Sequence, residues 1–401
     1  MPVLPYGRQC IDDDDVTAVA EVLRGDWLTT GPKVAAFEEA FAARVGARFA
    51  VACSSGTAGL HLAMLARGLG EGDVVIVPSM TFLATANAAC YVGAEVAFAD
   101  VDADTGLLDE PGLAAALTRA GGKAKAVAPV HMNGQSVDMT MVAEVVRDHG
   151  LAVIEDACHA IGAVARFGDD RDVPVGACRH SDMAVFSLHP VKLVAMGEGG
   201  VVTTNHQDLY ERLKRFRNHG MERDPARLEN KALGFNDRGT VNPWYYEMAE
   251  PGFNYRASDI NCALGLSQLG KLDRFLARRR ELAALYDKAL APLAPVVRPV
   301  PRMVDSESGW HLYVVLIDFE AAGMDRAALM GDLRERGIGT QVHYIPVHHQ
   351  PYYKRRYGEI LLPGADKYYA RCLSLPLFPA MADDDIDRVV GSLGRAIKGP
   401  R

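Results

Sequence analysis

The sequence contains no cluster of cysteines and no hydrophobic run long enough to cross a bilayer. Its seven cysteines are scattered without a C-x-x-C pair, which argues against both a disulfide framework and a zinc site. The first residues, MPVLPYGRQCIDDDD, have neither the basic leader nor the apolar segment of a signal peptide. These absences predict a cytoplasmic protein with reduced thiols and no membrane partner.

Basic residues are also too few and too dispersed for a sequence-independent nucleic-acid surface. Lys and Arg number 43 against 51 Asp and Glu, which gives a net charge of −8, and no basic block of five residues occurs. Histidines such as His343, His348 and His349 lack regular spacing with carboxylates, so we expect no metal site. With 401 residues, 49% of them hydrophobic, the chain has room for two domains.

Short apolar strands alternate with Ala/Leu-rich helical stretches between Phe49 and Thr204. This alternation predicts an α/β fold with a mostly parallel central sheet. The last strand follows a Gly-rich turn too short for a helical crossover, so we expect it to be antiparallel to its neighbour or added at an edge. The seven strands are read from FAVACS, VVIVPS, EVAFADV, AVAPVH, LAVIEDA, MAVFSL and VVTTN.

The pattern changes beyond the last of these strands. Residues 219–254 form a polar excursion from the core, and 259–290 read as one long helical region. After about Pro292, strand and helix patterns predict a smaller α+β domain. We place the boundary near residue 275, with residues 1–275 as the large domain and 276–401 as the small C-terminal domain.

Lys192 lies on a turn between two strand-like runs, a poor position for a solvated surface charge. A partly desolvated amine has a lowered pKa and can form a Schiff base with an aldehyde, which is how enzymes hold pyridoxal 5′-phosphate (PLP). Asp156 ends a predicted strand, where parallel sheets present ligand-binding groups, and it could keep the pyridine nitrogen of PLP protonated. The simpler alternative for Asp156 is a helix N-cap.

A phosphate cradle is predicted where the segment SSGTAGLHL follows a strand and opens a helix. The amides of Gly56, Thr57 and Ala58 form a candidate anion nest, with Ser187 as a second donor. A capped helix and a strand-end serine are the alternatives. His159 and Phe82 could lie against the cofactor ring or fill the core.

With these residues in view, the chain resembles the PLP-dependent DegT/DnrJ/EryC1/StrS family of sugar aminotransferases, which have fold type I. The resemblance covers nearly the whole chain and is highly specific. It rests on LTTGP, SSGTAGLHL, TFLATANA, EDACHAIGA, FSLHPVKLVAMGEGG, FNYRASDINCALGLSQL and GTQVHYIPVHHQPYY.

The resemblance implies a role for each matching residue. Lys192 would carry the cofactor and move the proton, Asp156 would bind the pyridine nitrogen, and His159 and Phe82 would flank the ring. Gly56, Thr57, Ala58 and Ser187 would hold the phosphate. Asn254 would reach the phosphate of the second subunit, which implies a homodimer with shared active sites and places the excursion near the interface.

Within the family, the chain most resembles the pseudaminic acid branch. This resemblance rests on the segments HPVK, CRHSDMAVFS, PWYYE and QVHYIPVH. That branch implies transfer of an amino group from L-glutamate to C4 of a UDP-linked 4-keto-6-deoxy-N-acetylhexosamine. The nucleotide sugar would lie against Tyr6, Trp27, Leu28, Thr29, Gln341, Val342, His343 and Tyr344. Leu188 departs from the family, where an aromatic is common, as does the run from Leu193 to Met196.

Three alternatives stay open on the sequence. The substrate could be another nucleotide-linked 4-keto sugar, of the GDP-perosamine or dTDP-amino-sugar type. The dehydratase relatives of the family carry histidine at the lysine position, so Lys192 argues against that chemistry. A non-catalytic PLP-binding regulator is the third alternative.

Overall fold

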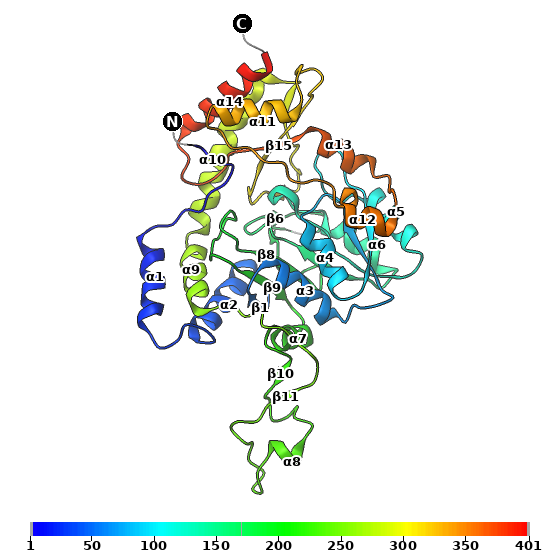
Figure 1. Ribbon diagram of the computed structural model, residues 1–401, viewed down its shortest axis with the longest axis vertical. Helices are drawn as coiled ribbons and strands as arrows, with labels where there is room; N and C mark the ends of the chain where they lie inside the picture. The colour runs from blue at the N-terminus through cyan, green and yellow to red at the C-terminus, as the bar shows by residue number, and fades with distance from the viewer. Residues whose placement is uncertain (1–2, 170, 399–401) are drawn as a thin grey trace.

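A seven-stranded sheet forms the centre of the protein in the computed structural model, which describes residues 3–169 and 171–398 (Figure 1). Its strand order is β1-β9-β8-β5-β4-β2-β3. All seven predicted strands are confirmed. They are β1 (Phe49–Cys53), β2 (Val74–Pro78), β3 (Glu95–Ala99), β4 (Ala124–Val127), β5 (Ala152–Asp156), β8 (Met183–Ser187) and β9 (Gly200–Thr204).

The strands from β3 to β8 in this order run parallel, as predicted. Strand β9 is antiparallel to both β8 and β1, so the antiparallel expectation is confirmed. The expectation of an edge position is wrong, because β1 lies outside β9 and closes that side of the sheet. A short turn sends β9 back beside β8, and β1 pairs with its free edge, which satisfies its backbone groups.

Helices cover both faces of the sheet because alternate strand residues are apolar on opposite sides. On β1, Val51 and Cys53 join the apolar cluster under α3, α4 and α7, whereas Ala50 and Ala52 join the cluster under α2 and α9. Helices α5 and α6 cover the second face near β2 and β4. The helices are α2 (Pro32–Val45), α3 (Gly56–Arg67), α4 (Leu83–Tyr91), α5 (Glu110–Ala120), α6 (Met139–Arg147) and α7 (Gln207–Arg217).

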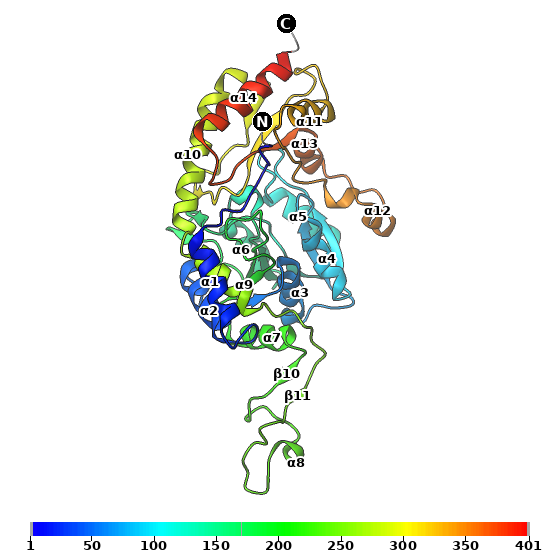
Figure 2. The same cartoon turned by 60° about the vertical axis from the view of Figure 1, so that its left-hand side comes forward.

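The predicted helical region 259–290 is two helices, α9 (Asp259–Leu269) and α10 (Leu272–Leu290), separated at Gly270. Near the N-terminus, helix α1 (Asp13–Arg24) packs along α9 (Figure 2). Leu272 and Leu276 of α10 contact the core of the large sheet, whereas Leu282 and Tyr286 contact a separate C-terminal core. The boundary near residue 275 falls inside α10 and stays a prediction.

The C-terminal part contains a three-stranded antiparallel sheet in the order β12-β14-β15. Helices α10, α11 and α14 share an apolar cluster with it. The elements of this part are η2 (Ala291–Leu293), β12 (Val297–Pro299), β14 (Tyr313–Ile317), α11 (Arg326–Glu335), η3 (Val347–His349), α12 (Pro351–Tyr357), α13 (Pro363–Arg371), β15 (Cys372–Leu375) and α14 (Asp383–Lys398). Short elements on the large sheet's side are η1 (Met132–Gly134), β6 (Val164–Ala165), β7 (Val173–Pro174) and β13 (Ser306–Glu307).

The polar excursion is an arm that projects from the body beyond α7 (Figures 1 and 2). It contains β10 (Met221–Glu222), α8 (Lys231–Gly234) and β11 (Glu247–Met248). Trp244 and Leu233 are 74% and 62% exposed on it. Large apolar side chains on a projecting arm are typical of a surface that contacts another chain. Of the helices that the structure describes, none is long and apolar enough to span a membrane.

Candidate active site

A cavity of about 520 Å³ opens where β5 and β8 end and α3 begins. Ligands in open α/β sheets bind beyond the carboxyl ends of the strands, so its position agrees with the fold. The predicted residues that line it are Tyr6, Gly56, Thr57, Phe82, Asp156, His159, Ser187, Lys192, Gln341, Val342, His343 and Tyr344.

Lys192 is partly buried on the turn that follows β8. Its backbone N–H donates to His189 O at 2.8 Å, which fixes the turn. Its Nζ lies 3.4 Å from Nε2 of His311. Burial lowers the pKa of the Lys192 amine, although the nearby Cys158 and Asp156 act in the opposite direction. A larger fraction of this amine is therefore neutral and nucleophilic at a given pH than for an exposed lysine.

Asp156 ends β5 and is 5% exposed. Thr85 Oγ1 donates to its Oδ2 at 2.6 Å, and the Cys158 N–H donates to its Oδ1 at 3.1 Å. The segment after it forms turns, with no helix to cap, so the N-cap alternative is wrong. These two donors orient the carboxylate at the cavity wall, where it can pair with a cationic ligand atom.

The start of α3 meets the end of β8 at a close contact. A Cβ on Gly56 would lie 2.8 Å from Ser187 Cβ, so only glycine fits there without displacing Ser187. Ser55 caps α3, and its Oγ accepts the Ala58 N–H at 3.1 Å. Thr57 and Ser187 line the cavity, whereas Ala58 does not. The positive end of the α3 dipole and these hydroxyls suit a phosphate group.

Three histidines gather beside Lys192. Nε2 of His159 lies 2.9 Å from the Tyr344 hydroxyl, and its ring centroid is 4.4 Å from that of His311. His343 Nδ1 lies 2.7 Å from Ser374 Oγ. Burial, and secondarily the charge of Lys192, lowers the pKa of all three, to about 3 for His343. The histidines are therefore neutral near pH 7. Lys192 is the residue among these four that can carry a positive charge or act as a base at this pH.

Two further features of the site fit PLP: buried histidine nitrogens without a hydrogen-bond partner, and an exposed aromatic ring. The Nδ1 atoms of His159 and His311 are buried without a hydrogen-bond partner. Phe82 is 54% exposed, with its ring tilted toward that of Tyr344 at 5.7 Å. An aromatic face, a cationic or neutral amine, a strand-end carboxylate and a helix N-terminus are the groups that a phosphorylated pyridine aldehyde requires.

The sequence did not point to His311 and Thr85. His311 contacts Lys192, and Thr85 contacts Asp156. His311 lies two residues before the buried strand β14 in WHLYVVLIDF, and a polar residue at that position was the available signal. Thr85 lies on α4, and Thr81 precedes that helix in the same TFLATANA stretch. The Oγ1 atoms of the two threonines are 2.7 Å apart. No pattern in the sequence links Thr85 to Asp156, because their contact joins residues 71 positions apart.

Five predicted site residues lie outside this cavity: Ala58, Trp27, Leu28, Thr29 and Asn254. Trp27 and Leu28 are 57% and 48% exposed, and Thr29 and Asn254 are also exposed. Thr29 bridges to Ser258 and Asn254 bridges to Asn218, which holds both segments on the surface near the start of α9 and the end of α7.

A second cavity, of about 550 Å³, is lined by arginines and carboxylates near α7. Three of its arginines pair with carboxylates of the same lining, in Arg217–Glu38, Arg227–Glu211 and the 3.4 Å contact of Arg215 with Glu222. The lysine in its lining, Lys214, is exposed, whereas Lys192 is partly buried in the cavity that it shares with Asp156.

Comparison with known protein families matches residues 9–394 to the DegT/DnrJ/EryC1/StrS aminotransferase family. The chain is 40% identical over 399 residues to the spore coat polysaccharide biosynthesis protein SpsC of Bacillus subtilis, covering 99% of this chain and 97% of SpsC. Helicobacter pylori PseC, an aminotransferase involved in the biosynthesis of pseudoaminic acid, superposes with a TM-score of 0.86 at 28% identity over 99% of both chains.

Spr1654 of Streptococcus pneumoniae is similar to the same degree, with a TM-score of 0.86 at 25% identity over 99% of both chains for its PLP form. It has also been solved in a PMP form. Aminotransferases of this family depend on PLP, which confirms the expected cofactor and the fold-type I architecture. The match over almost the whole length, together with the buried lysine and carboxylate, places this chain in the DegT/DnrJ/EryC1/StrS family of sugar aminotransferases.

Proposed function

We propose that this protein transfers an amino group from L-glutamate to C4 of a UDP-linked 4-keto-6-deoxy-N-acetylhexosamine. The observation that carries the reaction class is the position of Lys192, partly buried in a cavity of about 520 Å³ that it shares with Asp156. Lys192 offers the amine and Asp156 the carboxylate that transamination requires.

When bound, PLP supplies an aldehyde for amines and a ring that accepts the electrons released at the donor's α-carbon. Lys192 would hold the aldehyde, and Asp156 the pyridine nitrogen. Thr57, Ser187 and the N-terminus of α3 would hold the phosphate, with Phe82 stacked on the ring and His159 as a neighbour of the ring. The lining of the cavity supports this assignment.

Lys192 is also the residue placed to move protons. Its lowered pKa favours a neutral amine, which can take a proton from the donor's α-carbon and return one to the sugar's C4. The neighbouring histidines have pKa values well below their usual range, so they neither compete for this proton at neutral pH nor repel the lysine as cations. Asp156 would stabilise positive charge on the pyridine nitrogen in both half-reactions.

The similarity to PseC supports the UDP-linked N-acetyl sugar. The 40% identity to SpsC favours a second candidate, a different nucleotide-linked 4-keto sugar used for a polysaccharide. The two candidates share the chemistry at Lys192 and differ in what contacts Tyr6 and the segment from Gln341 to Tyr344.

An assay separates these candidates. The PLP-loaded protein is incubated with L-glutamate and, in separate reactions, UDP-, GDP- and dTDP-linked 4-keto-6-deoxy sugars, with the product identified by NMR. We expect kcat/KM to be largest for the UDP-linked N-acetyl sugar, and a higher value for a GDP or dTDP sugar would select the second candidate. A visible spectrum unchanged by glutamate would contradict the aminotransferase itself and favour a cofactor-binding regulator.

We further propose a homodimer with shared active sites. The exposed positions of Asn254 and of Trp27 to Thr29, outside the cavity of their own chain, support a contribution to the partner's cavity. The exposed apolar side chains of the arm support an interface there.

Mixed dimers test this arrangement. Lys192→Ala and Asn254→Ala are each expected to be nearly inactive alone, and hybrid dimers that carry one copy of each should regain one intact site. We expect the mixture, after subunit exchange, to recover up to about a quarter of wild-type activity, by random pairing. No recovery in mixtures shown to have exchanged subunits would contradict site sharing.

A further inference from the structure

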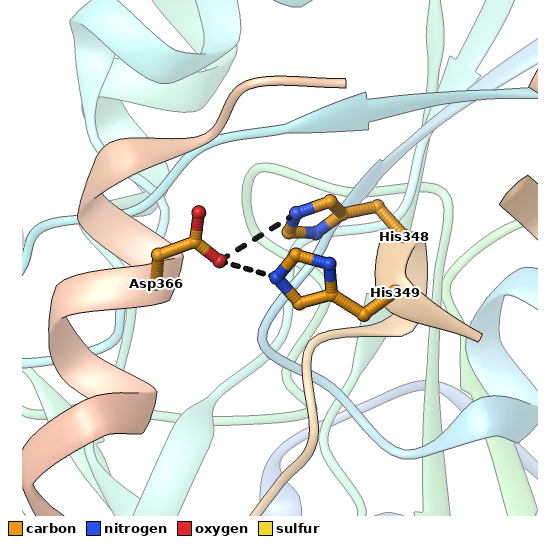
Figure 3. Close-up of side chains that lie close together, drawn as sticks. All are labelled: His348, His349 and Asp366. Atoms are coloured by element: carbon orange, nitrogen blue, oxygen red, sulfur yellow. Dashed lines mark hydrogen bonds and ion pairs between the residues drawn. The ribbon is translucent and has the colours of Figure 1, made fainter. Parts of the chain in front are cut away.

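Two histidines and an aspartate meet outside the cavity, although the sequence showed no metal-ligand spacing. His348 and His349 are neighbours on η3, and Asp366 lies in the first turn of α13 (Figure 3). Asp366 Oδ1 is 2.5 Å from His349 Nε2 and 3.6 Å from His348 Nε2. The three candidate ligand atoms all lie within 4.8 Å of one another.

His348 has an unsatisfied nitrogen at this point. Its side chain is 1% exposed, and its Nε2 is buried without a hydrogen-bond partner. The other ring nitrogen, Nδ1, is fixed 2.6 Å from Ser79 Oγ. A metal-binding histidine has this arrangement, with one nitrogen oriented by a polar group and the other directed at the ion. The hydrogen bond that His349 donates to Asp366 does not by itself account for the unpaired Nε2 of His348.

The distances are close to those of a tetrahedral ion site. Zinc bonds of about 2.0–2.1 Å to nitrogen and oxygen separate neighbouring ligand atoms by about 3.3–3.4 Å. The 3.6 Å between His348 Nε2 and Asp366 Oδ1 is near this value. The distance of 2.5 Å between His349 Nε2 and Asp366 Oδ1 must increase by about 0.8–0.9 Å when the ion binds. A rotation of the partly exposed Asp366 side chain allows this change.

The local charge and access also suit a cation. Asp100 lies nearby and accepts the Gly364 and Ala365 N–H groups at the start of α13, which adds negative charge. Lys354 is the opposing cation, and its Nζ is directed to Glu359 at 3.1 Å. His349 and Asp366 are 33% and 43% exposed, which gives an ion and a water molecule a path from solvent.

We propose that His348, His349 and Asp366 bind one divalent transition-metal ion of the zinc class, which joins η3 to α13. Two imidazoles and one carboxylate select Zn²⁺, Co²⁺ or Ni²⁺ over Mg²⁺ and Ca²⁺, which prefer oxygen ligands. A water molecule completes the coordination.

The ion has a structural role beside the active-site cavity. Gln350, directly after His349, lines that cavity. Ser79, which holds His348, is followed two and three residues later by Thr81 and Phe82 in the cavity wall. An ion at this point fixes both segments of the wall, without contact to the reacting atoms.

The test is a titration of the tag-free, full-length, PLP-loaded protein after chelator treatment. Calorimetry with Zn²⁺, and visible absorption with Co²⁺, should show one ion per chain with tetrahedral Co²⁺ bands. His349→Ala and Asp366→Asn should each weaken binding about 100-fold, since the first removes a ligand and the second replaces the carboxylate with an uncharged amide. The matched control is His149→Ala, an exposed histidine outside the cluster, which should bind as wild type.

Thermal melting gives an independent readout. Saturating Zn²⁺ should raise the melting temperature of the wild-type protein and of His149→Ala but leave that of Asp366→Asn unchanged, because an ion that binds the native state stabilises it. Asp366→Asn keeps a polar side chain on a partly exposed helix turn, and an unchanged cofactor spectrum checks its fold. Absence of a 1:1 complex at millimolar Zn²⁺ would overturn the proposal, as would equal binding by Asp366→Asn and wild type.

Discussion

The two sides of the active-site cavity are built in different ways. On the cofactor side, Asp156 ends β5, Ser187 ends β8, and Gly56 opens α3 between them. On the opposite side, Tyr6 and the segment from Gln341 to Tyr344 have irregular backbone held by isolated bridges, Leu4 to Ile338 and Gln341 to Ser374. The cofactor side therefore has a geometry set by the large sheet, and the other side can change with few packing consequences.

The largest expected effect on the cofactor side comes from Lys192→Ala. Loss of the amine that holds the cofactor and moves the proton should lower kcat by at least about 10³-fold. The visible absorbance of the lysine-bound cofactor should vanish as well. Lys123→Ala, at an exposed lysine, is the control and should keep both properties. Full activity in Lys192→Ala would remove the basis of the proposed function.

Asp156→Asn tests the charge of the strand-end carboxylate while its size is kept. We expect kcat to fall about 10²-fold, because the amide offers the pyridine nitrogen no negative charge. Thr85→Val leaves the carboxylate and removes only its 2.6 Å hydrogen bond, so its loss should be about tenfold or less. Steady-state measurements of kcat rank the two variants. An equal fall in kcat would show that Thr85 does more than orient the Asp156 carboxylate.

Gly56→Ala tests how tightly the sheet defines the phosphate end. The added Cβ would lie 2.8 Å from Ser187 Cβ, and crowding of this kind costs about 1–3 kcal/mol. We expect the Kd for PLP to rise about tenfold, measured by fluorescence titration. Gly331→Ala on α11, where an added Cβ meets open space, is the control and should leave PLP binding unchanged. Equal PLP affinity in the two variants would contradict the cradle.

Gln341→Ala probes the irregular side. Gln341 is exposed at the cavity, and its Oε1 accepts the Val342 N–H at 2.9 Å. We expect KM for the keto sugar to rise a few-fold, about 1 kcal/mol, with the glutamate half-reaction unchanged. Single-turnover spectra with glutamate alone measure the rate of the glutamate half-reaction. A slower glutamate half-reaction would show that this side also serves the donor.

The last expected effect is on stability instead of activity and concerns the buried histidines where the two sides meet. The pKa of His343 is lowered to about 3, against about 6.5 when exposed, so between these values the unfolded chain binds the extra proton. The free energy of unfolding of the cofactor-free protein should therefore fall as the pH drops from about 6.5 toward 3. His343→Gln should make urea midpoints less dependent on pH in this window. An unchanged pH dependence would assign the effect to other groups.

The sequence could predict the cofactor side because its residues follow patterns with short spacing. Strands read from apolar runs place Asp156 and Ser187 at strand ends, and the helix start after SSG places Gly56. The antiparallel direction of β9 followed from the short turn, but its interior position did not, because pairing with β1 joins residues about 150 positions apart.

Other features depended on contacts that no local pattern encodes. His311 reaches Lys192 across 119 positions, and Thr85 reaches Asp156 across 71. The break between α9 and α10 was missed because the apolar periodicity continues past Gly270. His349 meets Asp366 only through the packing of η3 on α13, so spacing along the chain gave no sign of their cluster.

One measurement tests the central claim most directly. The PLP-loaded protein is reduced with borohydride, digested, and the peptide that carries the pyridoxyl group is identified by mass spectrometry. We predict a single modified peptide that contains Lys192, with labelling suppressed by prior conversion of the cofactor with glutamate. A label on another lysine, or labelling that glutamate does not diminish, would contradict the assignment of Lys192 as the residue that holds the cofactor.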